Sequence, residues 1–97
     1  MIRHVSILTF VDEASASQIE AIEAALAGLP RRLPITRYAY GRDLGLNEGN
    51  ASFGVVADFD RVEDYLTYRD DPEHRRILAE VIGPILRARA VVQYEIS

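Results

Sequence analysis

The order of strand-like and helix-like segments is the feature of this sequence that most restricts its fold. Residues 3–10 alternate in a period of two, which predicts a strand, and a segment with helical spacing follows up to about Gly28. Two further strand-like segments, at 36–40 and 51–59, precede two helical segments and a last strand at 89–96. The chain therefore reads βαββ(αα)β, an order that leaves few topologies open.

Helix-start signals mark both helical regions. Ser15 and Ser17 each stand three residues before a glutamine or glutamate, so either can form a capping box. In the second region a helix over 61–69 is interrupted at Asp71-Pro72, where the carboxylate can cap a new helix and the proline has no N–H to lose. The new helix is expected to carry these residues on one face: His74, Ile77, Leu78, Val81, Ile82 and Ile85.

This order predicts an α+β, ferredoxin-like fold, in which residues 1–97 form a single domain with a four-stranded antiparallel sheet and helices on one face. The other face of the sheet is too apolar to lie comfortably in water. We therefore expect that face to pack on a second copy, so that a homodimer closes into an α+β barrel. The residues expected on it are Val5, Ile7, Thr9, Val56, Val91 and Gln93.

Composition excludes several kinds of chemistry. The 97 residues include no cysteine, which removes disulfides and thiolate nucleophiles, and all 11 basic residues are arginine, which removes Schiff-base lysines and the P-loop lysine. The net charge of -4 and the scattered arginines weigh against a nucleic-acid partner. The apolar segment 1–10 is interrupted by polar residues, so we expect no signal peptide, no membrane span and a cytoplasmic location.

Four short phrases lie in a characteristic order along the chain. They are Ile-Arg-His-Val at 2–5, Tyr-Ala-Tyr-Gly-Arg at 38–42, Tyr-Arg-Asp-Asp-Pro-Glu-His at 68–74 and Val-Val-Gln-Tyr-Glu at 91–95. Together they resemble the Dabb family, the stress-responsive α/β-barrel domain, over the whole chain. The resemblance implies a dimeric α+β barrel.

The resemblance extends to the plant polyketide cyclases of that family, which have a strand-one histidine and a Tyr-x-x-His-Pro-x-His phrase. In those enzymes the tyrosine and the last histidine close a ring by aldol condensation without a cofactor. The resemblance thus implies that Tyr68 and His74 are a catalytic pair, that His4 is a pocket residue and that no cofactor is needed. Asp71 departs from the pattern, because it stands where the family usually has its first histidine.

The residues themselves are compatible with those roles. His74 lies near a helix start and on an apolar stripe, where burial and the helix dipole both favour the neutral imidazole, which can act as a general base. Tyr68 lies six residues earlier, across the proline break, and its hydroxyl could donate to a carbonyl or enolate oxygen. The alternatives are a hydrogen-bonded core histidine and a tyrosine that packs only its ring. Tyr38, Tyr40, Tyr65 and Tyr94 are expected to pack or to form pocket wall.

Two other readings of the polar residues are rejected. His4 and Ser6 are two residues apart on one strand, roughly 6.5–7 Å, which is too far for a serine nucleophile and its base. The run from Asp70 to His74 contains four potential metal ligands, but consecutive residues at a helix start point in different directions and capping already explains the acids. We therefore expect no metal site.

The predicted function is the binding of a small apolar organic ligand between helices and sheet. Three roles stay open: a cofactor-independent lyase or polyketide-cyclase-like enzyme acting through Tyr68 and His74, a non-catalytic stress-associated binding or structural domain, and a cofactor-free monooxygenase of the dimeric α+β barrel type. The residues expected to line the ligand site are His4, Ser6, Leu8, Phe53, Val55 and Val92.

Overall fold

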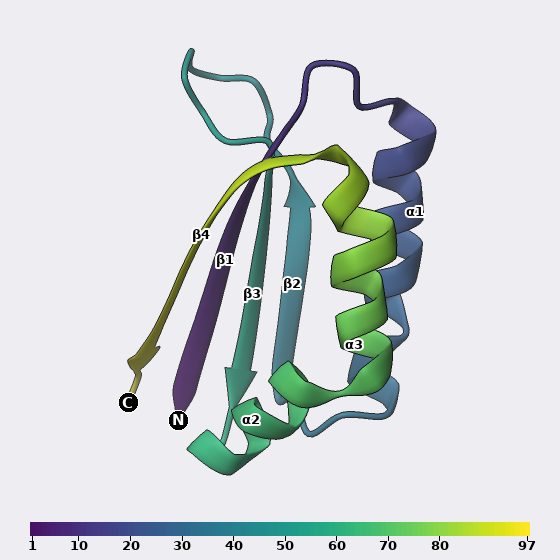
Figure 1. Ribbon diagram of the computed structural model, residues 1–97. Coiled ribbons are helices and arrows are strands. Elements are labelled where there is room, and N and C mark those ends of the chain that lie inside the picture. The colour runs from purple at the N-terminus through teal and green to yellow at the C-terminus, as the bar shows by residue number, and fades with distance from the viewer.

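The computed structural model describes residues 1–97 as one antiparallel sheet with helices on one face (Figure 1). The spatial order of the strands is β2-β3-β1-β4, in which a hairpin joins β2 to β3 and the two outer strands lie far apart. This arrangement confirms the ferredoxin-like α+β fold. The strands are β1 (Ile2–Phe10), β2 (Arg37–Arg42), β3 (Phe53–Phe59) and β4 (Leu86–Glu95).

The helices form a second layer that covers one face of the sheet. Figure 1 shows α1 and the coil that begins with α3 running side by side along this face, with α2 at one end of the sheet. No helix has both the length and the apolar character needed to cross a bilayer. The helical segments are α1 (Ala16–Ala27), η1 (Leu29–Arg31), α2 (Val62–Asp70), α3 (Pro72–Arg76), η2 (Ile77–Ile82) and η3 (Gly83–Ile85).

Both predicted helix starts are confirmed. Ser15 caps α1 through a complete capping box, in which its side chain accepts from the backbone N–H of Gln18 and the Gln18 side chain accepts from the backbone N–H of Ser15 at 2.9 Å. Of the two candidate boxes, the structure uses this one. The Asp71 carboxylate accepts from the backbone N–H of His74 at 2.9 Å and so caps α3.

The helix predicted to extend from Pro72 to Ile85 does not stay α-helical over its whole length. After α3 it loosens into the π-helix η2 and then tightens into the short 3₁₀-helix η3. Pro84 has no N–H to donate, so a regular α-helical ladder cannot continue through it. Gly83 allows the close approach that results, because a Cβ there would lie 3.1 Å from the carbonyl oxygen of Leu78.

One face of β4 was assigned wrongly from the sequence. The register pairs Gln93 with His4 and Val92 with Val5, so Val91 and Gln93 lie on the helix-covered face and Val92 lies on the open face. From Ala88 to Glu95 the strand alternates, with Ala88, Ala90, Val92 and Tyr94 on its apolar side. The sequence analysis turned that side to the helices, whereas the register places it on the open face; because both faces of this sheet carry apolar residues, the alternation did not show which face the apolar side joins.

The core lies between the covered face and the helices. The covered face carries His4, Ser6 and Leu8 on β1, which alternate with Val5 and Ile7 on the open face. The open face leaves apolar side chains in solvent, with Ile7 44%, Val92 53% and Tyr94 46% exposed. The buried core consists of Leu8, Phe10, Ile22, Leu26, Leu29, Phe53, Val55, Ala57, Phe59, Tyr68, Ile77, Ile82 and Ile85.

Candidate functional site

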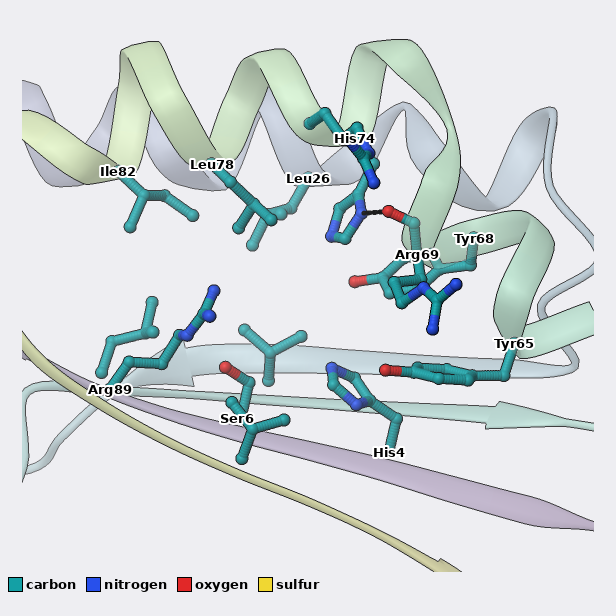
Figure 2. Close-up of a pocket in the computed structure, with 14 residues that line it drawn as sticks. His4, Ser6, Leu26, Tyr65, Tyr68, Arg69, His74, Leu78, Ile82 and Arg89 are labelled. Atoms are coloured by element: carbon teal, nitrogen blue, oxygen red, sulfur yellow. Dashed lines mark hydrogen bonds between the residues drawn. The ribbon is translucent and has the colours of Figure 1, made fainter. Parts of the chain in front are cut away.

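The core is interrupted by one sizeable cavity between the covered face and the second helical layer. Its volume is about 350 Å³, and most of its walls are apolar (Figure 2). A cavity of this size, with a few polar groups facing it, is typical of small-molecule sites. From the sheet it is lined by His4, Ser6, Leu8, Val55, Arg89 and Val91, and from the helices by Leu26, Tyr65, Tyr68, Arg69, His74, Arg75, Leu78 and Ile82.

The structure brings most of the sequence-predicted site residues together at this cavity. The two exceptions are Phe53, whose ring packs in the core against Phe10 with centroids 6.0 Å apart, and Val92, which lies on the open face. The residues that do line it are His4, Ser6, Leu8, Val55, Tyr68 and His74.

Several lining residues were missed from the sequence. Leu78 and Ile82 follow His74 at steps of four along the apolar stripe, so that spacing was a usable signal for them. Arg89 and Val91 were missed because the apolar side of β4, which includes Val92, was expected to face the helices, whereas the register places that side on the open face.

His74 is held in place by the start of α3. The Asp71 cap fixes this helix start, and the imidazole is 7% exposed. Nδ1 lies 3.4 Å from the carbonyl oxygen of Arg69, which can only accept, so Nδ1 carries the proton. Burial lowers the pKa of His74 below its usual value. The ring is therefore neutral near pH 7, and its other nitrogen, which Figure 2 shows facing the cavity, is a free base.

His4 has the opposite tautomer. The side-chain amide nitrogen of Gln93 lies 2.9 Å from Nδ1 of His4, and because an amide N–H only donates, Nδ1 accepts and the proton is on Nε2. Burial lowers the pKa of His4 to about 4, helped by the nearby His74 and Arg89. Near neutral pH His4 is therefore an uncharged N–H donor on the floor of the cavity.

Tyr68 lies between the two histidines. Its ring is 2% exposed, with its centroid 4.1 Å from that of His74 and 5.9 Å from that of His4. Burial raises the pKa of Tyr68, so the phenol keeps its proton and can donate it in a hydrogen bond. Its hydroxyl lies 3.2 Å from that of Tyr38, which approaches from β2, outside the cavity lining. The sequence analysis treated Tyr38 as packing or wall and missed this partner.

One end of the cavity thus brings together an acceptor and two donors. Nε2 of His74 can take a proton, while Nε2–H of His4 and the hydroxyl of Tyr68 can donate hydrogen bonds to a developing negative charge. Tyr65 closes the same end, with its ring centroid 5.3 Å from that of His4. The arrangement suits proton transfer on an organic molecule that contains a carbonyl or hydroxyl group.

The acidic run before His74 faces away from this chemistry. Besides capping α3, Asp71 pairs with Arg32 at 3.0 Å, and the Arg32 guanidinium lowers the pKa of that carboxyl. Asp70 pairs with Arg69 and Arg75. No group of three or more histidine, aspartate or glutamate side chains is placed so that it could hold a metal ion. Asp71, which stands where the resembled family usually has a histidine, does not line the cavity. This difference therefore affects the cap of α3 and not the groups that face the cavity.

Comparison with known proteins identifies the domain. The family model described as Dabb, the stress responsive A/B barrel domain, matches residues 2–96. A search of curated proteins finds no significant match.

Solved structures give the same fold. A dimeric ferredoxin-like protein of unknown function from Thermobifida fusca is 40% identical, with a TM-score of 0.90 over 98% of this chain and 90% of that one. A hydroxynitrile lyase from Passiflora edulis is 23% identical, with a TM-score of 0.84 over 99% and 93%. A Dabb family protein from Mesorhizobium loti is 16% identical, with a TM-score of 0.79 over 99% and 96%.

Proposed function

Because the chain belongs to the Dabb family of stress-responsive A/B barrel domains, we propose that it is a homodimer in which each cavity binds a small, mostly apolar organic molecule and acts on it as a cofactor-independent lyase or cyclase. One observation carries this proposal. A buried, neutral imidazole and two buried donors face the same apolar-walled cavity of about 350 Å³.

The open face of the sheet supports the homodimer. Its exposed Ile7 on β1 and Val92 on the edge strand β4 both lie next to Val5, which makes an apolar surface without a cover in the single chain. The relative from Thermobifida fusca, at 40% identity, is described as dimeric. A two-fold contact between two such faces buries both at once. It also leaves the cavity, on the opposite face, free to take a ligand.

The cavity groups fit the making or breaking of a carbon–carbon bond next to a carbonyl. In the cleavage direction, Nε2 of His74 takes the hydroxyl proton of a β-hydroxy ketone, the new carbonyl forms, and the carbon–carbon bond breaks. The electron pair of the broken bond moves into the ketone to give an enolate. The enolate oxygen accepts hydrogen bonds from Tyr68 and His4. The imidazolium of His74 then returns the proton to the α-carbon. Cyclisation is the same sequence reversed within one molecule, and no oxidant or reductant is consumed.

The named relatives are compatible with this chemistry. The protein from Passiflora edulis is called a hydroxynitrile lyase, so the same fold serves a lyase there. Its identity to this chain is 23%, so the support for this chain comes from the cavity and its residues.

The proposal is tested with the benzaldehyde–acetone aldol adduct, whose cleavage releases benzaldehyde and is followed by absorbance. We expect the wild-type protein to accelerate cleavage, and both Tyr68→Phe and His74→Ala to lower the rate at least a hundredfold, because each removes a group that acts on the reacting atoms. Tyr40→Phe is the matched control. Its hydroxyl bonds the carbonyl of Glu23, 3.3 Å away, and does not line the cavity, so the rate should not change.

Binding is measured in parallel with para-butylbenzyl alcohol, a neutral apolar probe. If the probe binds and the adduct is not cleaved, the cavity is a binding site without catalysis. If Tyr68→Phe and His74→Ala change the stability of the fold but neither binding nor cleavage, the two residues belong to the core and the proposal fails.

A further inference from the structure

Arg89 is a charged cavity residue that has no part in the chemistry proposed above. Arg89, on β4, pairs with Leu8 in the sheet register and lines the cavity. Figure 2 shows its side chain rising from β4 toward Ile82 and Leu78, at the end of the cavity opposite Tyr65. A guanidinium at this place is unexpected in a pocket whose nearest walls are aliphatic.

The charge of Arg89 is not balanced within the protein. The other two arginines that line the cavity, Arg69 and Arg75, both pair with Asp70, at 2.8 and 3.3 Å. The guanidinium of Arg89 has no carboxylate within 4.0 Å and donates no hydrogen bond to another protein group. No aspartate or glutamate is among the 14 lining residues.

The neighbouring polar groups do not supply a negative charge either. His4 and His74 are neutral near pH 7 and Tyr68 keeps its proton. The cavity therefore has a net positive charge, concentrated at the Arg89 end. Guanidinium groups bind carboxylates through two parallel hydrogen bonds, and such charge-assisted bonds are stronger than neutral ones.

We propose that Arg89 is an anion-recognition residue and that the ligand is an amphipathic carboxylate, with its carboxylate on Arg89 and its apolar part directed toward Tyr68 and His74. This inference rests on the proposed function, because it names the ligand class of the same cavity. Arg89 remains exposed at its position on β4, so the carboxylate keeps contact with water while the apolar part is buried. The two ends of the cavity thus have separate tasks, anchoring at Arg89 and reaction at His74.

The test compares two probes that differ only in charge, para-butylbenzoate and para-butylbenzyl alcohol, in titrations of the full-length protein. The carboxylate should bind at least tenfold more tightly, which corresponds to about 1.4 kcal/mol. In Arg89→Leu the ratio of the two affinities should fall to about one, while the alcohol binds as before. Arg89→Lys should keep part of the preference, because it keeps the charge and loses the bidentate geometry.

Arg87→Leu is the matched control on the same strand. Arg87 pairs with Asp12 at 3.3 Å and does not line the cavity, so its removal should leave both affinities unchanged. Equal binding of the two probes by the wild-type protein, or a preference for the carboxylate that survives in Arg89→Leu, would overturn the inference and leave the proposed function standing. Failure of both probes to bind would contradict the proposed function itself.

Discussion

The two faces of the sheet differ in how they are covered and packed. The face under the helices is packed by α1 and by the coil of α3 and η2, and it buries residues such as Ala57 and Phe59 completely. Its packing is interrupted by the cavity at Tyr68 and His74. The other face has no covering layer, and Ile7 and Val92 are about half exposed on it.

The difference supports a separate role for each face. A broad face with half-exposed apolar side chains fits a flat apolar partner, and a second sheet of the same kind provides one. A small cavity with an acceptor and donors at one end fits a small molecule. The proposed contact with another copy and the proposed ligand site thus lie on opposite sides of the same four strands, so each can be altered without the other.

The largest effect is expected from a charge placed on the open face. Ile7→Arg puts a guanidinium into the proposed interface twice, once from each copy, and a charge buried without a partner costs several kcal/mol. The dissociation constant of the dimer should rise at least a thousandfold, about 4 kcal/mol. Sedimentation equilibrium at micromolar concentration should show the monomer mass of 10.9 kDa for the variant and twice that mass for the wild-type protein.

The control for this variant is Ala24→Arg. Ala24 is exposed on α1, in the helical layer on the other side of the sheet from the open face, so the dimer should persist. A wild-type protein that is monomeric, folded and soluble would contradict the account of the open face.

A second prediction sharpens the contrast between filled and unfilled parts of the covered face. Ile77 and Leu78 are neighbours on η2, but Ile77 is fully buried and Leu78 lines the cavity. Ile77→Ala should lower the free energy of unfolding by about 3 kcal/mol, because it creates a void in a packed region. Leu78→Ala should cost about 1 kcal/mol and enlarge the existing cavity. Urea unfolding measures both, and equal losses would mean that the cavity is packed in solution.

Stability should also depend on pH through the covered face. Burial holds the pKa of both His4 and His74 below the unperturbed value of about 6.5, so the unfolded chain takes up protons first on acidification. The free energy of unfolding should therefore fall as the pH drops through about 6.5, and for His4 the loss continues to about 4. The slope is at most about 1.4 kcal/mol per pH unit for each histidine.

The titration of carboxylates does not contribute to the predicted change in the free energy of unfolding between pH 6.5 and 5. Arg3 and Arg32 lower the pKa values of Asp58 and Asp71, and a group shifted in this way loses its stabilising effect only as the pH falls below its unfolded value of about 4. His4→Gln should reduce the slope in this window. A slope that does not change in the variant would show that His4 is not buried in a neutral form.

The smallest effect is expected at the hydroxyl pair behind the cavity. Tyr38→Phe leaves the Tyr68 hydroxyl without its partner 3.2 Å away, which should cost about 1 kcal/mol of stability. Because the Tyr38 hydroxyl also fixes the direction of the Tyr68 hydroxyl, cleavage of the aldol adduct should slow by less than in Tyr68→Phe. Thermal unfolding and the absorbance assay measure the two effects. An unchanged rate would make Tyr38 a purely structural residue.

The sequence predicted the fold and the grouping of Tyr68 and His74 at the cavity because those depend on local signals. Asp71-Pro72 specifies a helix start, and the spacing from His74 to Ile77 specifies the face that turns to the sheet. The other end of the cavity could not be predicted. Arg89 lies on the more polar side of an alternating strand, and both faces of this sheet carry apolar residues, so only the register of β4 against β1 shows that Arg89 faces the helices. The contact between Tyr38 and Tyr68 joins residues 30 positions apart and needs the folded chain.

The most direct test of the cavity uses the two imidazoles, which are the only ones in the protein. A proton–nitrogen correlation spectrum of the histidine rings near neutral pH should show two neutral rings of opposite tautomer, with the proton on Nε2 in His4 and on Nδ1 in His74. Titration with para-butylbenzoate should shift both rings along one saturable curve. Two rings that stay unchanged while the probe binds elsewhere, or that titrate freely near their unperturbed value, would contradict the claim that His4 and His74 face one ligand site.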